Sequence, residues 1–435
     1  MKKLLRVFAL LLTVVFLGSM LFACSTPQAP APAPAQAEEA TSAPAAPEAQ
    51  EPVEKAKLLV WEHTPQFEEP LKQVIAAFMS KNPNITVDYE IKTPDQYYNL
   101  LATTIQAGEA PDLFWTNGTA TSNYGGYANQ GVLMDITDKV DLSFYPAAAL
   151  KLVDIDGRYY STPGATADTR AVYYNKDIFT ELGLSVPKTF DEFEHSLQTI
   201  LDAGYVPLAL GGSFFWSTLF TFEPILAAMA PDWLEAAAKN EVSVNDPRVA
   251  DVFKKMIEWG EKGYFGPGYL GVDEGGQLLA FSKGEAAMTI TGSWNVSTFA
   301  SNNPDLKYGA FQLPRSDGLR PMIVTYACGF AVSANTEYPE AAIAFAQFAS
   351  SIEGQSIWVK ALNGIPGLPG IVSDDPVIAE MTQNDVQVES FYSILGDFAA
   401  EGANPRQILE EDATKVLSGS LTPEEFLQSI EALMK

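Results

Sequence analysis

The chain has 435 residues, of which 47% are hydrophobic and 11% aromatic, so it is long enough for two domains with their own cores. Its formal net charge at pH 7 is −27. A surface this acidic repels nucleic acid and anionic lipid, which argues against both as binding partners.

The first 23 residues have the features of an export signal. The basic start MKKLLR precedes the apolar run VFALLLTVVFL, which is too short to span a membrane comfortably. Residues 21–24, LFAC, place Ala23 directly before Cys24 and resemble a bacterial lipobox. We therefore expect residues 1–23 to be a lipoprotein signal peptide and Cys24 to become the lipidated first residue of the mature protein. The alternative is an ordinary signal peptide in which Cys24 is incidental.

Residues 24–56 are expected to comprise the lipidated cysteine and a disordered tether. The segment is rich in Pro, Ala and Glu and offers nothing from which to build a core, so it stays extended. It would hold the folded body away from the cell membrane, in a periplasmic or cell-surface setting. The second cysteine, Cys328, lies in the apolar run MIVTYACGFAV and is expected to be a buried thiol. A lipidated Cys24 could not form a disulfide with it.

An alternation of strands and helices begins at Lys57. KLLVWEH is typical of a buried strand, and EEPLKQVIAAFMSKNP predicts a helix with one apolar face, formed by Leu71, Val74, Ile75, Phe78 and Met79. ITVDYEI alternates apolar and polar residues, as a half-buried strand does. DQYYNLLATTIQAG predicts a helix that ends at Gly108, and PDLFWTN a short strand. This order predicts an α/β layer with a mostly parallel sheet.

A second α/β set follows along the chain. TRAVYYN predicts a strand, and Thr189 with Glu192 forms a T-x-x-E capping box that starts the helix FDEFEHSLQTILDAG. YVPLALGG, DPRVADVFKKMIEWGEKG and QLLAFSKGEAAMTITGSW continue the alternation. EYPEAAIAFAQFASS predicts a helix with Pro339 near its first position. LTPEEFLQSIEALMK predicts the last helix, with an apolar face.

Several kinds of catalytic site lack the residues they need. The chain has neither a P-loop nor a G-x-G-x-x-G motif, and it has only two histidines, so we expect no cofactor and no catalysis. A carboxylate pair for glycan cleavage stays open, because such pairs are spaced in three dimensions and not in sequence. Ferric iron bound by adjacent tyrosines also stays open, although strand packing explains Tyr173-Tyr174 more simply.

Aromatic side chains recur beside polar ones where strands are expected to end. Examples are Trp115-Thr116-Asn117, Asp168-Thr169-Arg170 and Trp294-Asn295. Ligands of α/β sheets bind at the carboxyl ends of the strands. Flat rings cover the apolar faces of a sugar, while carboxylates and amides hold its hydroxyls through directional hydrogen bonds. For a single tryptophan core packing is the better explanation, but the shared position favours a carbohydrate site.

From about Lys57 to the C-terminus, the chain resembles the bacterial extracellular solute-binding proteins of ABC importers, family 1, which includes the maltose-binding protein. The resemblance rests on FMSKNPNITVDYE, IQAGEAPDLFWTN, DGRYYSTPGATADTRAVYYNKDIF, FSKGEAAMTITGSW and NGIPGLPG in this order. It implies an α/β fold of the type II periplasmic-binding-protein class, whose two lobes are mixed, mostly parallel sheets flanked by helices. The ligand would lie in the cleft between the lobes and cause hinge closure.

The resemblance also implies domain boundaries and site residues. Lobe 1 would comprise residues 57–165 plus 328–362 and lobe 2 residues 166–327 plus 363–435, with crossings near Thr166, Tyr326 and Gly364. Trp115 and Asn117 match a segment that lines lobe 1, Asp168 a sugar-binding carboxylate and Trp294 a stacking ring. Tyr97-Tyr98 replaces the acidic pair of maltose binders, which argues against maltodextrin. The full set of expected ligand-binding residues is Glu62, His63, Tyr98, Trp115, Asn117, Asp168, Arg170, Trp216, Trp294, Tyr326 and Phe391.

The function that follows from this resemblance is a lipid-anchored, monomeric receptor. It would capture an oligosaccharide or sugar derivative outside the cytoplasm and deliver it to the transmembrane subunits of an ABC permease. The alternatives are an anchored glycan-cleaving enzyme and a ferric-iron-binding member of the same superfamily.

Overall fold

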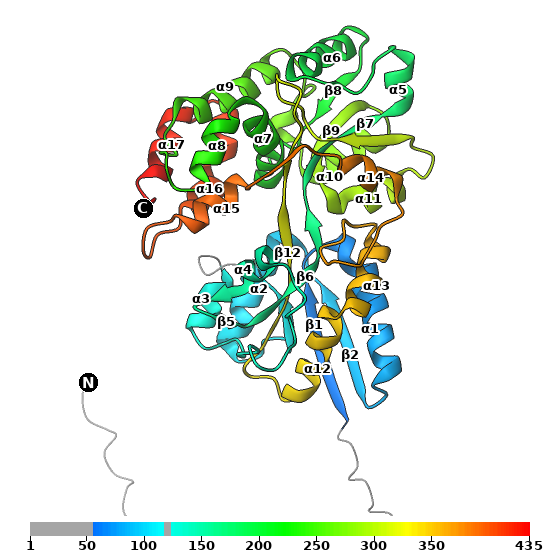
Figure 1. The fold of residues 1–435 in the computed structure, drawn as a ribbon, viewed down its shortest axis with the longest axis vertical. Coiled ribbons are helices and arrows are strands. Elements are labelled where there is room, and N and C mark those ends of the chain that lie inside the picture. Colours follow the sequence, from blue (N-terminus) through cyan, green and yellow to red (C-terminus); the bar gives the residue numbers. More distant parts are fainter. Residues whose placement is uncertain (1–54, 117–122) are drawn as a thin grey trace, which may run out of the picture. The chain divides into compact units, whose positions relative to one another are not determined.

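The computed structural model describes residues 55–116 and 123–435, which belong to one compact unit (Figure 1). The expected signal peptide, Cys24 and almost the whole tether lie outside the described residues, as does Asn117. Within the described ranges, no helix has the length and apolar character that crossing a membrane requires.

Among the described residues, five strands form the first sheet in the order β2-β1-β3-β12-β6. They are β2 (Ile85–Ile91), β1 (Ala56–Glu62), β3 (Leu113–Trp115), β12 (Thr325–Val332) and β6 (Ser161–Asp168). β1 pairs in parallel with β2 and β3, whereas β12 pairs antiparallel with β3 and β6. The carboxyl ends of β1 and β3 therefore meet at one edge of the sheet.

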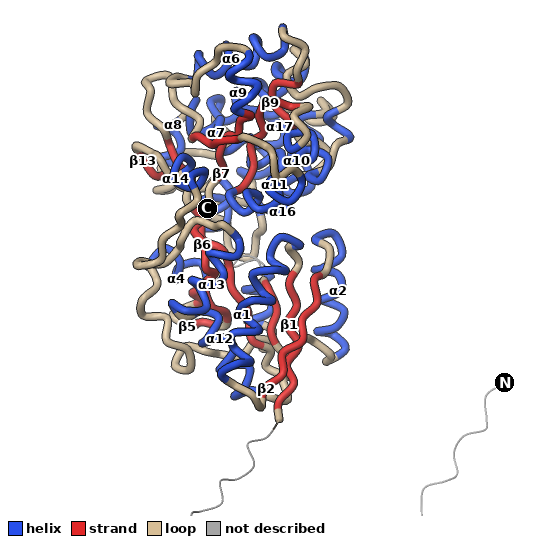
Figure 2. The backbone as a smooth tube through the Cα atoms, turned by 90° about the vertical axis from the view of Figure 1, so that its right-hand side faces the viewer, coloured by secondary structure: helices blue, strands red, loops and turns tan. Residues whose placement is uncertain are grey.

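Helices cover both faces of this sheet, because alternate residues of each strand point to opposite sides. On one face, Leu58 and Val60 of β1 pack with α1 (Glu68–Lys81) and α12 (Pro339–Ser350), and Figure 2 shows these helices beside the strands. On the other face, Trp61 packs with α2 (Pro94–Ala107). The apolar face expected for α1 is confirmed, with Met79 half-buried at its margin.

The second sheet has the order β10-β7-β9-β8. Its strands are β10 (Tyr308–Phe311), β7 (Arg170–Asn175), β9 (Ala286–Gly292) and β8 (Val206–Ala209). Only β8 and β9 pair in parallel; β7 runs antiparallel to both of its neighbours. Both sheets are thus mixed, as expected, but they are less parallel than the sequence suggested, because β12 and β7 run against the strands beside them.

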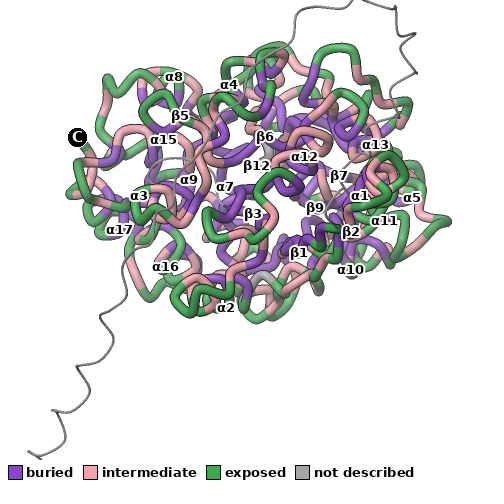
Figure 3. The backbone as a smooth tube through the Cα atoms, turned by 90° about the horizontal axis from the view of Figure 1, so that it is seen from below, coloured by how far each residue is buried: buried purple, intermediate pink, exposed green. Residues whose placement is uncertain are grey.

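The remaining elements surround these two sheets, and Figure 3 shows buried segments toward the middle of the molecule and exposed segments at its periphery. Further helices, given in chain order, are α3 (Asn123–Asn129), α4 (Ala147–Val153), α5 (Lys176–Glu181), α6 (Phe190–Asp202), α7 (Phe215–Met229), α8 (Pro231–Ala237), α9 (Pro247–Glu261), α10 (Glu274–Ser282), α11 (Val296–Asn302), α13 (Ile352–Leu362), α14 (Pro376–Met381), α15 (Phe391–Asp397), α16 (Pro405–Leu417) and α17 (Pro423–Glu431). Two small sheets pair β4 (Asp154–Ile155) with β5 (Arg158–Tyr159) and β11 (Pro321–Ile323) with β13 (Val386–Val388). Short 3-10 helices are η1 (Pro65–Phe67), η2 (Tyr269–Gly271) and η3 (Ser293–Asn295).

Three segments that are far apart in sequence lie side by side between the two sheets. β12 pairs with β6 through Thr325 and Asp168, and the backbone N–H of Ala167 donates to Ile365 O at 3.1 Å. β7 begins at Arg170, two residues after β6 ends. These are the neighbourhoods in which the chain crossings are expected, and the lobe boundaries themselves stay a prediction.

Three local features predicted from the sequence have different outcomes in the structure. Tyr173 is buried in one core and Tyr174 packs against another, so the two rings face opposite sides of β7, as a strand requires. Cys328 is half-buried and not buried as expected, because it lies in β12 beside a bulge in the pairing with β6. At α6, Thr189 Oγ1 accepts from Glu192 N, but Glu192 Oε2 accepts from Lys188 N, so only half of the expected capping box forms.

Candidate functional site

The carboxyl ends of β1 and β3 hold a cluster of expected site residues. Glu62 is the last residue of β1 and is fully buried. Its Oε1 accepts from the backbone N–H groups of His63 at 2.8 Å and Thr64 at 3.0 Å, and it lies 2.9 Å from His63 Nδ1. The His63 ring stacks on Trp115, with centroids 4.1 Å apart and planes inclined by 23°. Glu62 therefore sets the orientation of His63, and His63 shares a platform with Trp115.

Two tyrosines of α2 border this platform. The hydroxyl of Tyr97, a fully buried residue, donates to Trp115 O at 2.6 Å. Tyr98 is half-buried, and its ring centroid lies 5.9 Å from that of His63. Burial raises the pKa of the Tyr98 hydroxyl well above its usual value, so it remains a neutral donor at physiological pH.

A second cluster of expected site residues lies around Trp294, near the end of β9 and the start of β7. Trp294 follows β9 in η3, and its ring contacts Phe220 edge-on at 5.1 Å. The guanidinium of Arg170 lies 4.8 Å from the Phe220 ring centroid and 5.7 Å from that of Trp294. Trp294 is half-buried, so one part of its ring stays accessible. A side chain at Gly292 would overlap the indole, so glycine leaves the room that this ring position needs.

Asp168 closes the second cluster on the side of β6. It is half-buried, and Ser293 Oγ donates to its Oδ1 at 3.4 Å. Burial raises the pKa of Asp168 to about 6, against the opposing effects of the Arg170 charge and of the nearby Thr166 and Ser293 hydroxyls. The carboxyl thus changes its charge near neutral pH.

Arg170 itself is held by a buried carboxylate. Its Nε lies 3.1 Å from Glu223 Oε2, with side chains 7% and 1% exposed, in a contact that is an ion pair without good hydrogen-bond alignment. Arg170 also donates to Thr325 Oγ1 at 2.8 Å. The other oxygen of Glu223 accepts from Ser390 Oγ at 2.6 Å and from Tyr392 N at 3.2 Å. One ion pair therefore connects β7, α7, β12 and the start of α15.

The aromatic residue that α15 presents to the Trp216 ring is Tyr392. Its ring centroid lies 5.1 Å from that of Trp216, and its hydroxyl donates to Glu410 Oε1 at 2.7 Å. Phe391, the residue expected from sequence, is 1% exposed and packs in the core against Phe222. Adjacent helical residues point in different directions, so a shift of one position exchanges a core residue for one beside the site.

The two clusters are joined by a polar contact. Gln66 Nε2 in η1 donates to Asn295 Oδ1 at 3.1 Å, and Asn295 Nδ2 donates to Thr291 Oγ1 at 2.9 Å. The turn after β1 therefore contacts the residue directly after Trp294. Tyr326, also expected in the site, is a half-buried residue of β12 that pairs with Ala167 and packs against both neighbouring cores.

Three neighbours of the candidate site were not predicted from the sequence: Phe220, Glu223 and Tyr392. Phe220 and Glu223 lie in α7, an apolar and almost wholly buried helix without a clear polar face. The one signal in the sequence was Glu223, an acidic residue within this apolar run. A carboxylate buried in such a helix needs a cationic partner, which here is Arg170.

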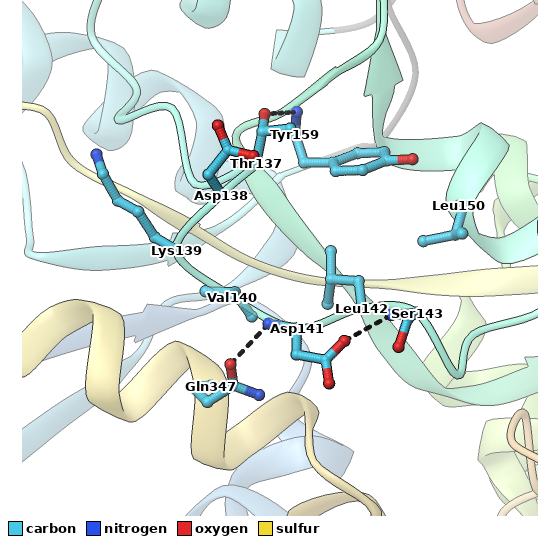
Figure 4. Close-up of a pocket in the computed structure, with 10 residues that line it drawn as sticks. All are labelled: Thr137, Asp138, Lys139, Val140, Asp141, Leu142, Ser143, Leu150, Tyr159 and Gln347. Carbon is cyan, nitrogen blue, oxygen red and sulfur yellow. Dashed lines mark hydrogen bonds between the residues drawn. The ribbon is translucent and has the colours of Figure 1, made fainter.

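A surface hollow elsewhere on the molecule contains none of the expected site residues. It has a volume of about 560 Å³ and is lined by residues 137–143, Leu150, Tyr159 and Gln347 (Figure 4). Asp141 N donates to Gln347 Oε1 at 2.7 Å across it. Within the described ranges, no group of three His, Cys, Asp or Glu side chains is arranged to hold a metal ion.

Replacing Glu223 should destabilise the fold strongly. Glu223→Leu leaves the Arg170 guanidinium buried without its partner, and we expect the free energy of unfolding to fall by about 3–5 kcal/mol. Denaturant titration of the purified protein measures this loss. In the double variant Arg170→Met, Glu223→Leu, much of the stability should return. An unchanged unfolding free energy in Glu223→Leu would show that the ion pair contributes little.

Replacing Asp168 should make stability less dependent on pH. Because the folded-state pKa of about 6 lies above the unfolded value of 3.8, the folded state binds the proton more tightly, and stability falls as the pH rises from 3.8 to about 6 and then levels off. Asp168→Asn removes this penalty, so the variant should gain up to about 3 kcal/mol over wild type at pH 8 and almost nothing at pH 4. Parallel melts of both proteins across this range measure the difference. A constant difference at all pH values would contradict the assignment.

Comparison with known sequences gives a consistent result. A model of the bacterial extracellular solute-binding protein family matches residues 64–356. An ABC transporter extracellular-binding protein of Pyrococcus horikoshii is 25% identical over 392 residues, which is 84% of this chain and 87% of that protein. The galactooligosaccharide-binding protein of Bacillus subtilis is 24% identical over 349 residues, covering 78% of this chain and 79% of its own length.

Comparison with solved structures identifies proteins with a similar fold. A chitin oligosaccharide binding protein superimposes with a TM-score of 0.73 at 23% identity, covering 86% of this chain and 97% of that one. This likeness confirms the expected fold class, the two-lobe periplasmic-binding-protein fold of type II. Since the family model spans well over half of the sequence, the chain belongs to the bacterial extracellular solute-binding protein family.

Proposed function

We propose that this protein is the extracytoplasmic receptor of an ABC importer, that it binds an oligosaccharide or sugar derivative, and that it delivers this ligand to the permease subunits. The relatives named above bind galactooligosaccharides and chitin oligosaccharides, which supports a carbohydrate. It acts by binding and hinge closure, without catalysis.

The observation that carries this proposal is the surroundings of Trp294. Its half-buried ring lies beside a guanidinium, that of Arg170, and directly follows Ser293, which contacts the Asp168 carboxyl. An indole face covers the apolar C–H face of a pyranose, and charged groups at its edge bind the hydroxyls. A hydroxyl that is missing or misplaced leaves such a buried group without a partner, which is how the site would select among sugars.

The platform at the ends of β1 and β3 would contact the ligand from the other lobe. The stacked rings of His63 and Trp115 offer a second flat surface, and the neutral hydroxyl of Tyr98 offers a donor. Trp216 and Tyr392 would extend the aromatic surface for a longer chain of sugar units. Hinge closure would bring these groups together around the ligand.

A panel of ligands tests the carbohydrate assignment directly. A ligand that binds the native state raises the melting temperature, and a ligand at about 100 times its Kd contributes about 2.7 kcal/mol. We expect at least one chito-, galacto- or xylo-oligosaccharide at millimolar concentration to shift the melting curve upward, and ferric citrate to leave it unchanged. If no carbohydrate gives a shift, or if the protein releases cleavage products, the receptor assignment fails.

Trp294→Ala should weaken binding of the sugar found in that panel by tenfold or more, equivalent to about 1.4 kcal/mol. The ring is half-buried, so only a modest loss of melting temperature is expected. Trp294→Phe keeps a flat apolar face and should retain most of the affinity. Isothermal titration calorimetry on the three proteins measures the effect. If Trp294→Ala leaves the affinity unchanged and causes a large loss of stability, the role of Trp294 is purely structural.

Anchoring through lipidated Cys24 is part of the same proposal and rests on the lipobox-like LFAC and on the Pro-, Ala- and Glu-rich segment after it. The lipid would hold the receptor near its permease on a flexible tether. In a bacterial host, Cys24→Ala should lose the lipid and, once the signal peptide is removed, shift the protein from the membrane fraction to the soluble fraction. Continued recovery of Cys24→Ala with the membrane would contradict lipid anchoring.

A further inference from the structure

A small, partly open cavity lies beside the platform at the ends of β1 and β3. Its volume is about 30 Å³, and its walls come from β1, η1, β3, β6, β12, α12 and α13. Apolar rings of Phe67, Phe330 and Trp358 form part of the lining. The cavity therefore has room for at least one water molecule.

Three polar side chains line this cavity with atoms that have no hydrogen-bond partner among the described residues. These atoms are Glu62 Oε2, Gln355 Oε1 and Trp115 Nε1. Glu62 and Gln355 are 0% and 4% exposed. Gln355 Nε2 donates to Ala349 O at 2.7 Å, which fixes the amide so that its oxygen is the end left for the cavity. Leaving three such groups unpaired would cost about 1–3 kcal/mol each.

The chemistry of these three atoms identifies what would satisfy them. Two are acceptors and one is a donor. A water molecule donates two hydrogen bonds and accepts at least one, which matches this set. A sugar hydroxyl has a single hydrogen and would leave one acceptor unpaired. A metal or ammonium ion cannot accept from the indole N–H and would be repelled by it.

We propose that the cavity holds one structural water that accepts from Trp115 Nε1 and donates to Glu62 Oε2 and Gln355 Oε1. This water joins the ends of β1 and β3 to α13. It fixes the rotation of the Trp115 indole from behind, while His63 stacks on the same ring from another side. Gln355 is thereby a positioning residue for the platform, although its own contacts are with α12 and the cavity. This inference stands whether or not the ligand is a sugar.

A crystal structure of the unliganded protein at a resolution that shows ordered solvent tests the proposal. The expected result is one oxygen within about 2.7–3.2 Å of all three atoms. A metal ion in the cavity, or side chains that have closed it and bonded to one another, would overturn the proposal. A site that fills only when a sugar is soaked in would also overturn it, because the occupant would then be a ligand hydroxyl.

Nuclear magnetic resonance of the indole N–H groups gives a second test in solution. In wild type, the Trp115 indole proton should show a cross-peak to a long-lived water, assigned by its loss in Trp115→Phe. Gln355→Met removes one of the three partners with little change in size, so this cross-peak should disappear and the melting temperature should fall by a few degrees. Because Gln355→Met also loses the hydrogen bond to Ala349, part of the fall in melting temperature has another cause. The indole cross-peak is therefore the deciding measurement.

Gln347→Met is the matched control for this test. Gln347 also makes one side-chain hydrogen bond to the backbone, accepting from Asp141 N at 2.7 Å, but it lines the surface hollow and not the cavity. The control should therefore leave the Trp115 indole signal unchanged. An indole signal that is the same in wild type and Gln355→Met would contradict the water-mediated role of Gln355.

Discussion

The candidate site depends on the buried ion pair between Arg170 and Glu223. Removing two charges from water is costly, and only close pairing with further hydrogen bonds offsets that cost. Here the further bonds come from Thr325, Ser390 and the backbone of Tyr392, so the pair connects segments that are far apart in the sequence. Arg170 is thereby held beside the rings of Phe220 and Trp294.

The two halves of the site have different chemical characters. At the ends of β1 and β3, the side chains are oriented by local contacts, as when Glu62 binds the two backbone N–H groups that follow it. At the second sheet, the side chains are oriented by long-range contacts through Glu223 and Asp168. The first half offers flat rings and neutral donors, whereas the second adds a fixed positive charge and a carboxyl group. A ligand with apolar faces and a hydroxyl rim would use both.

Much of the fold could be predicted because the sequence pattern of many segments matches the surroundings of that segment in the folded protein. The apolar face of α1 and the alternation in β2 depend on nearest neighbours, and so does the position of Trp294 after β9. The helix α7 was missed because a segment that is apolar on all sides has no helical period to detect. The mixed sheets were judged too parallel because the place of β12 between β3 and β6 is decided by contacts across more than 150 residues.

The site was predictable in its residue types but not in its geometry. Trp115, Asp168 and Trp294 follow from their positions at strand ends, yet nothing in the sequence distinguishes Phe391, which lies in the core, from Tyr392, which contacts Trp216. The contact between Gln66 and Asn295 joins residues 229 positions apart, and no local pattern encodes it. The sequence does not indicate the position of Gln355 either, because its place beside Glu62 arises only when α13 packs on the first sheet.

A crystal structure of the protein with a bound oligosaccharide would show whether the two clusters form the binding site. We expect a sugar ring whose apolar face lies on Trp294, with hydroxyls in hydrogen-bond contact with Asp168 or Arg170 and with the His63–Trp115 platform on the opposite side. A ligand that binds tightly yet touches neither Trp294 nor this platform would contradict the proposed site.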